Sequence, residues 1–183
     1  MIIGDRVRLR AVEKDDLPRY VAWFNDSEVR EYLEMILPMS SEDEEEWYQN
    51  TRKLPPPERP FAIDIRDGEE WQHVGSCGFL HVDHINSQAE LGISIGEKEY
   101  WGKGYGTETV LLLLKTAFEI LNLNRVYLRV YEKNTRGIRA YEKAGFVLEG
   151  RLRDAKFSQG GYQDVLYMGI LRSEWISGKE KRG

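Results

Sequence analysis

Three glycines occupy alternate positions in the segment Trp101-Gly102-Lys103-Gly104-Tyr105-Gly106. An apolar stretch precedes this segment and an amphipathic stretch follows it, which predicts a turn from a strand into a helix. Glycine allows positive φ and lets the backbone approach a ligand closely. The unpaired N–H groups at the start of a helix bind anions, and Lys103 adds positive charge. The segment therefore suits a bound phosphate, although its spacing fits a plain tight turn equally well.

The spacing of these glycines excludes two common phosphate-binding motifs. A P-loop requires Gly-x-x-x-x-Gly-Lys followed by Ser or Thr, and the chain contains no such string. A dinucleotide-binding motif requires Gly-x-Gly-x-x-Gly, whereas Thr107 stands where the third glycine would be. What is left is an alternating glycine turn at the start of a helix.

A second segment, Asn134–Phe146, carries the pattern Asn-x-x-(small)-x-x-x-Tyr-x-x-x-Gly-Phe, with Gly137 at the small position and Tyr141 at the tyrosine. In this order and at this distance, the two segments resemble the cofactor motifs of the GNAT superfamily of N-acetyltransferases. The first motif of that family usually opens with Gln or Arg, where this chain has Trp101. Since backbone amides are the main ligands of the pyrophosphate there, this departure weakens the resemblance only slightly.

The resemblance covers nearly the whole chain. The stretches Arg8–Asp16 and Gly161–Val165 look like the branch that contains ribosomal-protein N-terminal acetyltransferases and spermidine N-acetyltransferases. The resemblance implies acetyl-CoA as co-substrate. It places cofactor contacts on a strand, on the glycine turn and at the start of the second segment: Ile93, Ser94, Ile95, Trp101, Gly102, Lys103, Gly104, Tyr105, Gly106, Thr107, Asn134, Arg136 and Arg139. For the two arginines, a solvated helix face is an equally good interpretation.

Transfer of an acetyl group to an amine needs a neutral nucleophile, a stabilised oxyanion and a proton for the departing thiolate. Tyr141 matches the family's general acid, and a phenol of pKa about 10 can donate that proton. The alternative role for Tyr141 is packing of its helix on the sheet. Glu90, just upstream on the cofactor strand, is the candidate base, acting through water; a structural salt bridge is the competing interpretation.

Cys77 and the run His81-Val82-Asp83-His84 are the other reactive side chains of note. One cysteine and closely spaced histidines match no common zinc pattern. Direct attack by an amine needs no covalent enzyme intermediate. We therefore expect neither a metal site nor thiol chemistry.

Hydrophobic periodicity predicts the elements that position these residues. Alternation predicts strands over 6–10, 61–66, 74–82, 89–95, 125–131, 146–151 and 164–171. Spacing and capping residues predict helices over 17–24, 27–33, 41–53, 107–121 and 134–144, the third of them opened by a capping box of Ser41 and Glu44. The fold class is α+β (mixed α/β): a single GNAT-like domain with a largely antiparallel central sheet flanked by helices. We assign residues 1–175 to this domain and 176–183 to a polar tail.

Composition limits the partners. The 183 residues carry a net charge of −5, which argues against a protein that binds nucleic acid through its phosphates. No apolar run approaches the about 20 residues that cross a bilayer, and the N-terminus does not read as a secretory signal. The lone cysteine and these absences predict a cytoplasmic protein. A homodimer is expected only because relatives often form one.

The acceptor predicted from the family is a primary amine, either a polyamine or a protein N-terminus. Its site is expected between the helices over 15–53 and the loop near Phe157–Gln163, where the acidic run 42–46 could attract a cation. A solvated helix face explains that acidic run better. Aminoglycosides and amino-sugars are alternative acceptors, and a non-catalytic acyl-CoA-binding regulatory module is the alternative function.

Overall fold

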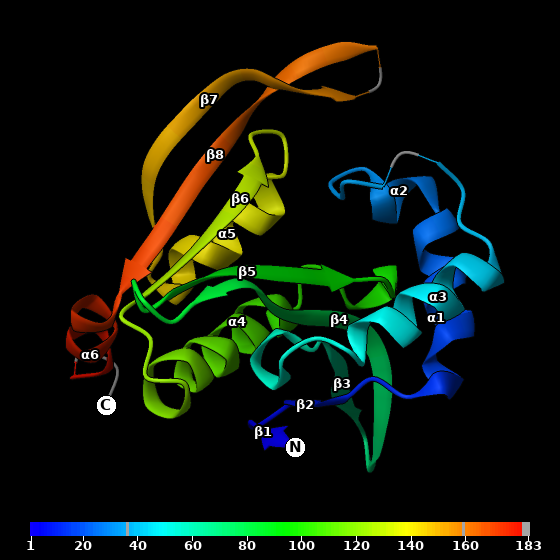
Figure 1. Cartoon of the computed structure of the whole chain (residues 1–183), viewed down its shortest axis with the longest axis horizontal. Coiled ribbons are helices and arrows are strands. Elements are labelled where there is room, and N and C mark those ends of the chain that lie inside the picture. Colours follow the sequence, from blue (N-terminus) through cyan, green and yellow to red (C-terminus); the bar gives the residue numbers. More distant parts are fainter. Residues whose placement is uncertain (36, 159, 181–183) are drawn as a thin grey trace.

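The computed structural model describes residues 1–35, 37–158 and 160–180. One twisted sheet runs through this part of the chain, with its strands in the order β1-β2-β3-β4-β5-β6-β8-β7 (Figure 1). The strands are β1 (Ile2–Ile3), β2 (Val7–Ala11), β3 (Phe61–Asp67), β4 (Glu70–Asp83), β5 (Gln88–Ile95), β6 (Arg125–Tyr131), β7 (Val147–Ser158) and β8 (Gly161–Leu171). Only β5 and β6 pair in parallel, so the predicted mixed α/β fold with a largely antiparallel sheet is confirmed.

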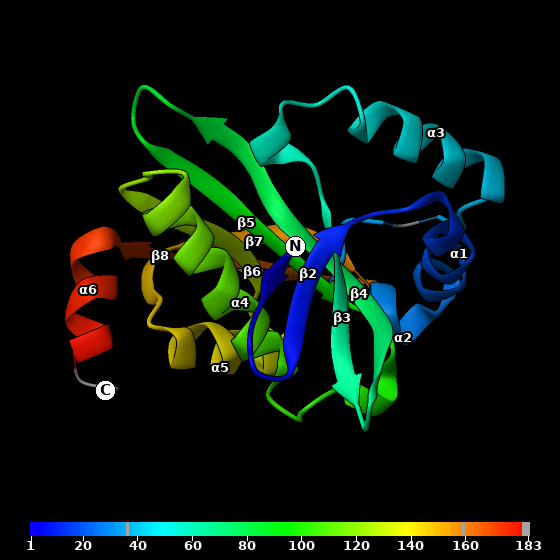
Figure 2. The same ribbon diagram turned by 90° about the horizontal axis from the view of Figure 1, so that it is seen from below.

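Helices lie on both faces of the sheet (Figure 2). They are α1 (Leu17–Asn25), α2 (Ser27–Arg30), α3 (Ser41–Thr51), α4 (Tyr105–Lys115), α5 (Thr135–Ala144) and α6 (Arg172–Glu180). Helix α4 continues as a wider π-helical turn over Thr116–Ile120. Helices α4 and α5 pack on the main core, whereas α1, α2 and α3 build a second cluster on the other face. None of the described helices combines the length and apolar character that crossing a membrane requires.

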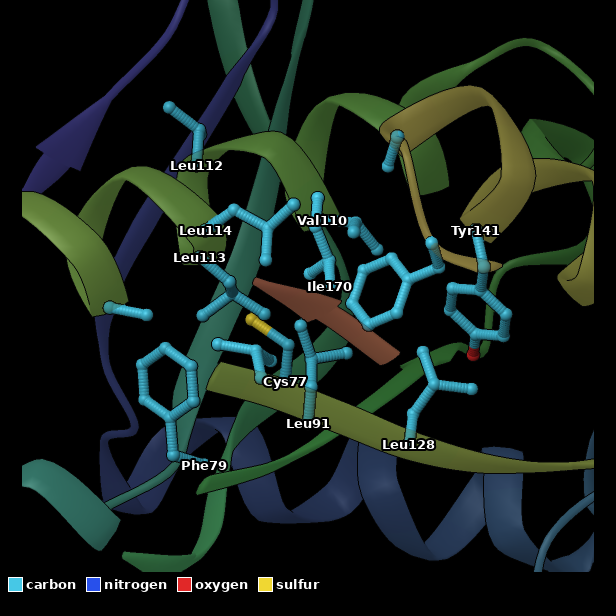
Figure 3. Close-up of a cluster of buried hydrophobic side chains, with 14 of the residues drawn as sticks. Cys77, Phe79, Leu91, Val110, Leu112, Leu113, Leu114, Leu128, Tyr141 and Ile170 are labelled. Carbon is cyan, nitrogen blue, oxygen red and sulfur yellow. The ribbon is translucent and has the colours of Figure 1, made fainter. Parts of the chain in front are cut away.

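The main core lies between α4 and the strands (Figure 3). Alternate residues of the central strands point into it, among them Cys77, Leu91 and Leu128, and each of these is at most 5% exposed. From α4, Val110 and Leu113 meet them, both fully buried. Every second residue of the strands and one face of α4, which has 3.6 residues per turn, thus contribute to one apolar layer.

Strands β5 and β6 diverge along their length and open a gap in the sheet. Their parallel ladder holds three residue pairs and ends at Glu90–Tyr127. Beyond it β5 continues to Ile95 and β6 to Tyr131 without pairing to each other. A sheet that parts in this way leaves backbone groups of both strands unpaired inside the molecule, where a ligand can reach them.

The N-cap of helix α3 lies one residue earlier than the sequence predicted. Ser40, not Ser41, is the N-cap: its hydroxyl accepts the Asp43 N–H at 3.1 Å, and the Asp43 carboxylate accepts the Ser40 N–H at 2.8 Å. Both serines have an acidic residue three positions later, so the string alone does not choose between them. With the cap on Ser40, Glu44 turns inward and is 1% exposed; the predicted box of Ser41 and Glu44 is wrong.

Other predicted boundaries moved as well. Helix α2 spans four residues rather than 27–33. The last two strands are far longer than predicted and form a hairpin that extends away from the rest of the sheet (Figure 1). Gln159, in the loop predicted near Phe157–Gln163, and residues 181–183 of the predicted tail lie outside the described residues. The boundary predicted at residue 175 falls inside α6, whose Trp175 is buried.

Candidate active site

A cleft of about 750 Å³ opens where β5 and β6 part. It runs from the start of α4 and α5 at one end to the segment after α2 and the β7–β8 hairpin at the other. Twelve of the predicted site residues line it: Ile93, Ser94, Ile95, Trp101, Gly102, Gly104, Gly106, Thr107, Asn134, Arg136, Arg139 and Tyr141. The structure thus brings three distant segments together, while Lys103, Tyr105 and Glu90 lie off the lining.

The backbone of β5 presents alternate residues to the cleft. The Ile95 carbonyl accepts a hydrogen bond from the Trp101 side chain, on the side away from β4. Ser94 faces the other way, because its carbonyl oxygen lies against Gly75 of β4, 2.1 Å from where a Cβ on Gly75 would be. Groups of residues two apart on a strand point to the same side. Ile93 and Ile95 therefore direct their N–H groups into the gap, whereas the Ser94 amide belongs to the β4 ladder.

The glycine turn ends in a left-handed residue that starts α4. Gly102 and Gly104 have φ of 73° and 89°, and Gly104 is the N-cap of the helix. The first N–H to bond within α4 is that of Glu108, which donates to the Gly104 carbonyl. The N–H groups of Tyr105, Gly106 and Thr107 precede it and have no partner inside the helix, so they form an anion-binding turn.

The side chains of Lys103 and Tyr105 turn away from the cleft. The Lys103 ammonium lies 5.3 Å from the Tyr100 ring centroid, and Tyr105 packs under the Arg6 guanidinium at 4.8 Å. Both residues were predicted to contact the cofactor. Tyr105 could contact an anion only through its backbone N–H. Lys103 adds positive charge nearby without lining the site.

Glu108 holds the turn in place, a role that the sequence prediction missed. Its carboxylate accepts the backbone N–H groups of Arg6 and Val7 at 2.7 and 3.0 Å, and the Arg6 side chain at 3.0 Å. These bonds tie the first turn of α4 to β2. The signal in the sequence is an acidic residue in the first turn of a helix, a favourable place for a negative charge.

Trp101 occupies the position where the family motif usually has Gln or Arg. Its indole N–H donates to the Ile95 carbonyl at 2.7 Å, and the Arg136 guanidinium stacks on its ring at 3.6 Å. Burial lowers the pKa of Arg136 below its ordinary value. Trp101 thus links β5 to the start of α5, and Arg136 adds a positive charge on the lining beside the turn.

Asn134 is the N-cap of α5. Its side-chain oxygen accepts the Gly137 N–H at 2.9 Å, which leaves the amide NH₂ as the group that a ligand could use. The small residue in the motif has a steric cause, because a Cβ on Gly137 would stand 2.8 Å from the Asn134 side-chain nitrogen. Gly145 ends the helix at φ 107°, as predicted.

Tyr141 lies at the margin of the main core (Figure 3), and its ring meets that of Phe146 edge-on with centroids 6.0 Å apart. It is 9% exposed and lines the cleft. Burial raises the pKa of its phenol to about 12. The hydroxyl is therefore protonated at neutral pH, the state that a general acid requires.

Glu90 is 6% exposed and ion-paired: the Arg129 side chain donates to its carboxylate at 2.7 Å. Arg129 also reaches Glu34, with 3.3 Å between Nη1 and Oε1. The salt bridge that competed with the role of Glu90 as base is thus present. The role of Glu90 as base stays a prediction. Glu90 would have to act from a position that does not line the cleft.

At the acceptor end of the cleft, one side comes from the predicted region 15–53, and the other comes from a part of the hairpin that was not predicted. Val29, Tyr32, Leu33 and Glu34 line one side, and Leu152, Ala155, Lys156, Val165 and Tyr167 line the other. Among the described residues, neither the acidic run 42–46 nor the segment Phe157–Gln163 is on the lining. The hairpin is longer than predicted, so its middle rather than its tip faces the cleft.

Cys77 lies in the main core at 5% exposure, and burial raises the pKa of its thiol above the ordinary value. In the described part of the chain, no three His, Cys, Asp or Glu side chains are grouped so that they could hold a metal ion. Asp83 caps the turn after β4 by accepting the Ile85 and Asn86 N–H groups at 2.9 Å.

Comparison with known proteins agrees with this geometry. The family model of the acetyltransferase (GNAT) domain matches residues 6–147. The spermidine N(1)-acetyltransferase of Vibrio cholerae is 32% identical over 97% of this chain and 100% of its own, and that of Escherichia coli K12 is 30% identical over 93% and 89%. The solved structure of the Vibrio cholerae enzyme in complex with CoA and spermine superposes with a TM-score of 0.85 at 31% identity, over 94% of this chain and 99% of that one. The chain belongs to the GNAT family of N-acetyltransferases.

Proposed function

We propose that this protein transfers the acetyl group of acetyl-CoA to a primary amine, and that polyamines are its acceptor class. One observation carries the cofactor half of the proposal. The free N–H groups of Ile93 and Ile95, the first turn of α4 and the Tyr141 hydroxyl all open into a single cleft. That set supplies hydrogen-bond donors for an extended pantetheine chain, an anion site for its pyrophosphate and a proton donor beside the gap.

The residues of the chain fit such a ligand. The left-handed conformations of Gly102 and Gly104 let the backbone face a phosphate without a side chain in between. Arg136 adds a cation beside the same turn, and Asn134 offers its amide NH₂. When bound there, acetyl-CoA supplies the acyl group and a thiolate leaving group.

Each chemical requirement then has a candidate residue. A backbone N–H of β5 would stabilise the developing oxyanion, a kind of contact that contributes roughly 3 kcal/mol. Tyr141 would hold the proton that the thiolate takes up. The amine must lose a proton before attack, and Glu90 could receive it only through water, because its carboxylate is already bonded to Arg129.

The polyamine assignment rests on the relatives, since two of them are named for acetylation of spermidine. The exposed carboxylate of Glu34 is on the acceptor lining, where an ammonium group would share it with Arg129. An N-terminal peptide and an aminoglycoside belong in the same acceptor screen as polyamines, because both also present primary amines.

The test is thiol release from acetyl-CoA with a panel of polyamines, N-terminal peptides and aminoglycosides. We expect turnover with polyamines, and no turnover with any amine would refute catalysis. Separately, acetyl-CoA at millimolar concentration should raise the melting temperature, because a ligand that binds only the folded state stabilises it. CoA binding without any turnover would favour a non-catalytic acyl-CoA-binding module.

Two further expectations accompany this proposal. A homodimer is checked by light scattering of the purified protein. A cytoplasmic location is checked by fractionation of cells that express the chain at its natural level.

A further inference from the structure

A row of three charged side chains crosses the acceptor end of the cleft. Glu90 is buried, Arg129 is partly exposed on the lining, and Glu34 is largely exposed, with side-chain exposures of 8%, 37% and 72%. Arg129 binds both carboxylates: its Nε lies 2.7 Å from Glu90 and its Nη1 lies 3.3 Å from Glu34. One guanidinium therefore pairs with both carboxylates, of which Glu34 is on the lining, where an incoming ammonium group would otherwise meet it, and Glu90 lies behind the lining.

The charges at this end of the cleft nearly cancel. Among the described residues, Glu34 is the single acidic residue on the lining. The cations on the lining are Arg129 and Lys156 from the strands, and Arg136, Arg139 and Lys143 from α5, which begins at the other end of the cleft. The Lys156 ammonium lies 5.0 Å from the centroid of the Tyr131 ring. With the cations of α5 left out and the buried Glu90 added, the acceptor end holds two positive and two negative groups. An acceptor with several ammonium groups would find no excess of negative charge.

We propose that Arg129 is a specificity-determining residue that selects acceptors by charge. It neutralises Glu90 and competes for Glu34, so each additional ammonium group on an acceptor gains little from the cleft. This inference rests on the proposed function, because it assumes that amines bind at this end. Beyond that function, Arg129 would determine how strongly the affinity for an acceptor depends on the number of its positive charges.

Physical chemistry gives the direction of the effect. Replacing Arg129 by glutamine leaves Glu90 and Glu34 facing Lys156, a net charge of −1 in place of zero. The attraction of this added charge grows with the charge on the ligand, so a tetraamine gains more than a diamine does. A change in packing alone would alter the binding of all amines alike.

Arg125 provides a matched control. It lies four residues earlier on β6, on the same face, and is also ion-paired with a glutamate, Glu149. It does not line the cleft. Arg125→Gln therefore removes a comparable surface ion pair without changing the charge that an acceptor meets.

The experiment measures dissociation constants by titration calorimetry for putrescine, spermidine and spermine, a series of two, three and four amines. Full-length wild type, Arg129→Gln, Arg129→Lys and Arg125→Gln are compared at one ionic strength. We expect Kd to change little along the series for wild type. For Arg129→Gln it should fall about threefold per added charge. Arg129→Lys keeps the charge and should behave like wild type, as should Arg125→Gln.

Equal dependence on ligand charge in wild type and Arg129→Gln would overturn the inference, and so would the absence of binding to both. Should Arg129→Gln fail to give a melting transition, Glu34→Gln takes its place: it frees Arg129, and Kd should then rise with ligand charge. Failure of the proposed function is a separate result, namely no thiol release with any amine in the wild type.

Discussion

At the scale of single residues, the site consists of buried groups whose protonation or direction is set by a neighbour. Tyr141 keeps its proton because its ring is buried. The Glu90 carboxylate accepts a hydrogen bond from Arg129, and Trp101 donates its N–H to the Ile95 carbonyl of β5. The chemistry of each side chain is ordinary; its surroundings select the form that is present.

Replacing Tyr141 by phenylalanine should lower kcat by about 100-fold, since a general acid typically contributes two to four orders of magnitude. The KM for acetyl-CoA should change less than about twofold, because the ring still fills its place against Phe146. Steady-state kinetics of thiol release measure both constants. Tyr162→Phe, at a 65% exposed position on the hairpin, is the control and should match wild type. Full kcat in Tyr141→Phe would remove the assignment.

Sequence patterns identified most of these residues but not their contacts. Asn134, Gly137 and Tyr141 could be predicted because their spacing along one helix is local. The partners of Trp101 and Glu90 could not, since Ile95, Arg136 and Arg129 approach them only through tertiary packing. The role of Arg129 was missed for the same reason: on the chain it is one more polar residue of an alternating strand.

At the scale of elements, strands and helices with a buried face were the predictable ones. β6 follows its predicted bounds because every second residue enters the core. β7 does not follow its predicted bounds, because most of its residues are exposed on a protruding hairpin and show no alternation of buried and exposed positions. The cap of α3 was misplaced by one residue where two serines adjoin.

The glycine turn gives a test at this scale. Gly104→Ala places a Cβ on a residue with φ 89° and should cost about 1–2 kcal/mol of stability. It should also raise the KM for acetyl-CoA about tenfold, because the turn must move to relieve the strain and its N–H groups would then point elsewhere. Urea unfolding and thiol-release kinetics measure the two effects.

Gly68→Ala is the matched control for that variant. Gly68 has φ 62°, lies in the turn between β3 and β4, and has no atom within 4 Å of an added Cβ. It should lose similar stability and keep the KM of wild type. An unchanged KM in Gly104→Ala would show that the turn does not bind the cofactor through its backbone.

At the scale of the whole molecule, the helices on the second face of the sheet bury two acidic side chains with opposite pH responses, Asp16 before α1 and Glu44 in α3. Burial opposes ionisation of Asp16, but hydrogen bonds from Arg10 and His73 outweigh it and hold its pKa far below the ordinary value. Burial alone raises the pKa of Glu44 to about 7. The first group favours folding when it is ionised, the second when it is neutral.

These signs predict a stability maximum between the unfolded pKa values of the two groups, 3.8 for Asp16 and 4.5 for Glu44. The contribution of Asp16 is present above its unfolded pKa of 3.8 and is lost as the pH falls. That of Glu44 is complete below its unfolded pKa of 4.5 and is lost as the pH rises toward about 7. Urea unfolding across this range should show a decline of about 2–3 kcal/mol on the alkaline side.

The Glu44→Gln variant isolates the alkaline decline. Glutamine cannot ionise, so its unfolding free energy should stay level between the two pKa values. Glu46→Gln, at an exposed position of the same helix, should retain the slope of wild type. An identical slope in all three proteins would mean that Glu44 is not the group that titrates.

The parting of β5 and β6 has a consequence for amide hydrogen exchange. Although Ile93, Ser94 and Ile95 are neighbours in the middle of a sheet, only the Ser94 amide faces a partner strand. The amides of Ile93 and Ile95 should therefore exchange with deuterium at least about tenfold faster than that of Ser94 in the free protein. Acetyl-CoA should slow exchange of the Ile93 and Ile95 amides and leave that of Ser94 unchanged. Exchange at the gap between β5 and β6 would then report whether the cleft is occupied. Equal exchange rates of the three amides in the free protein would contradict the N–H directions assigned along β5.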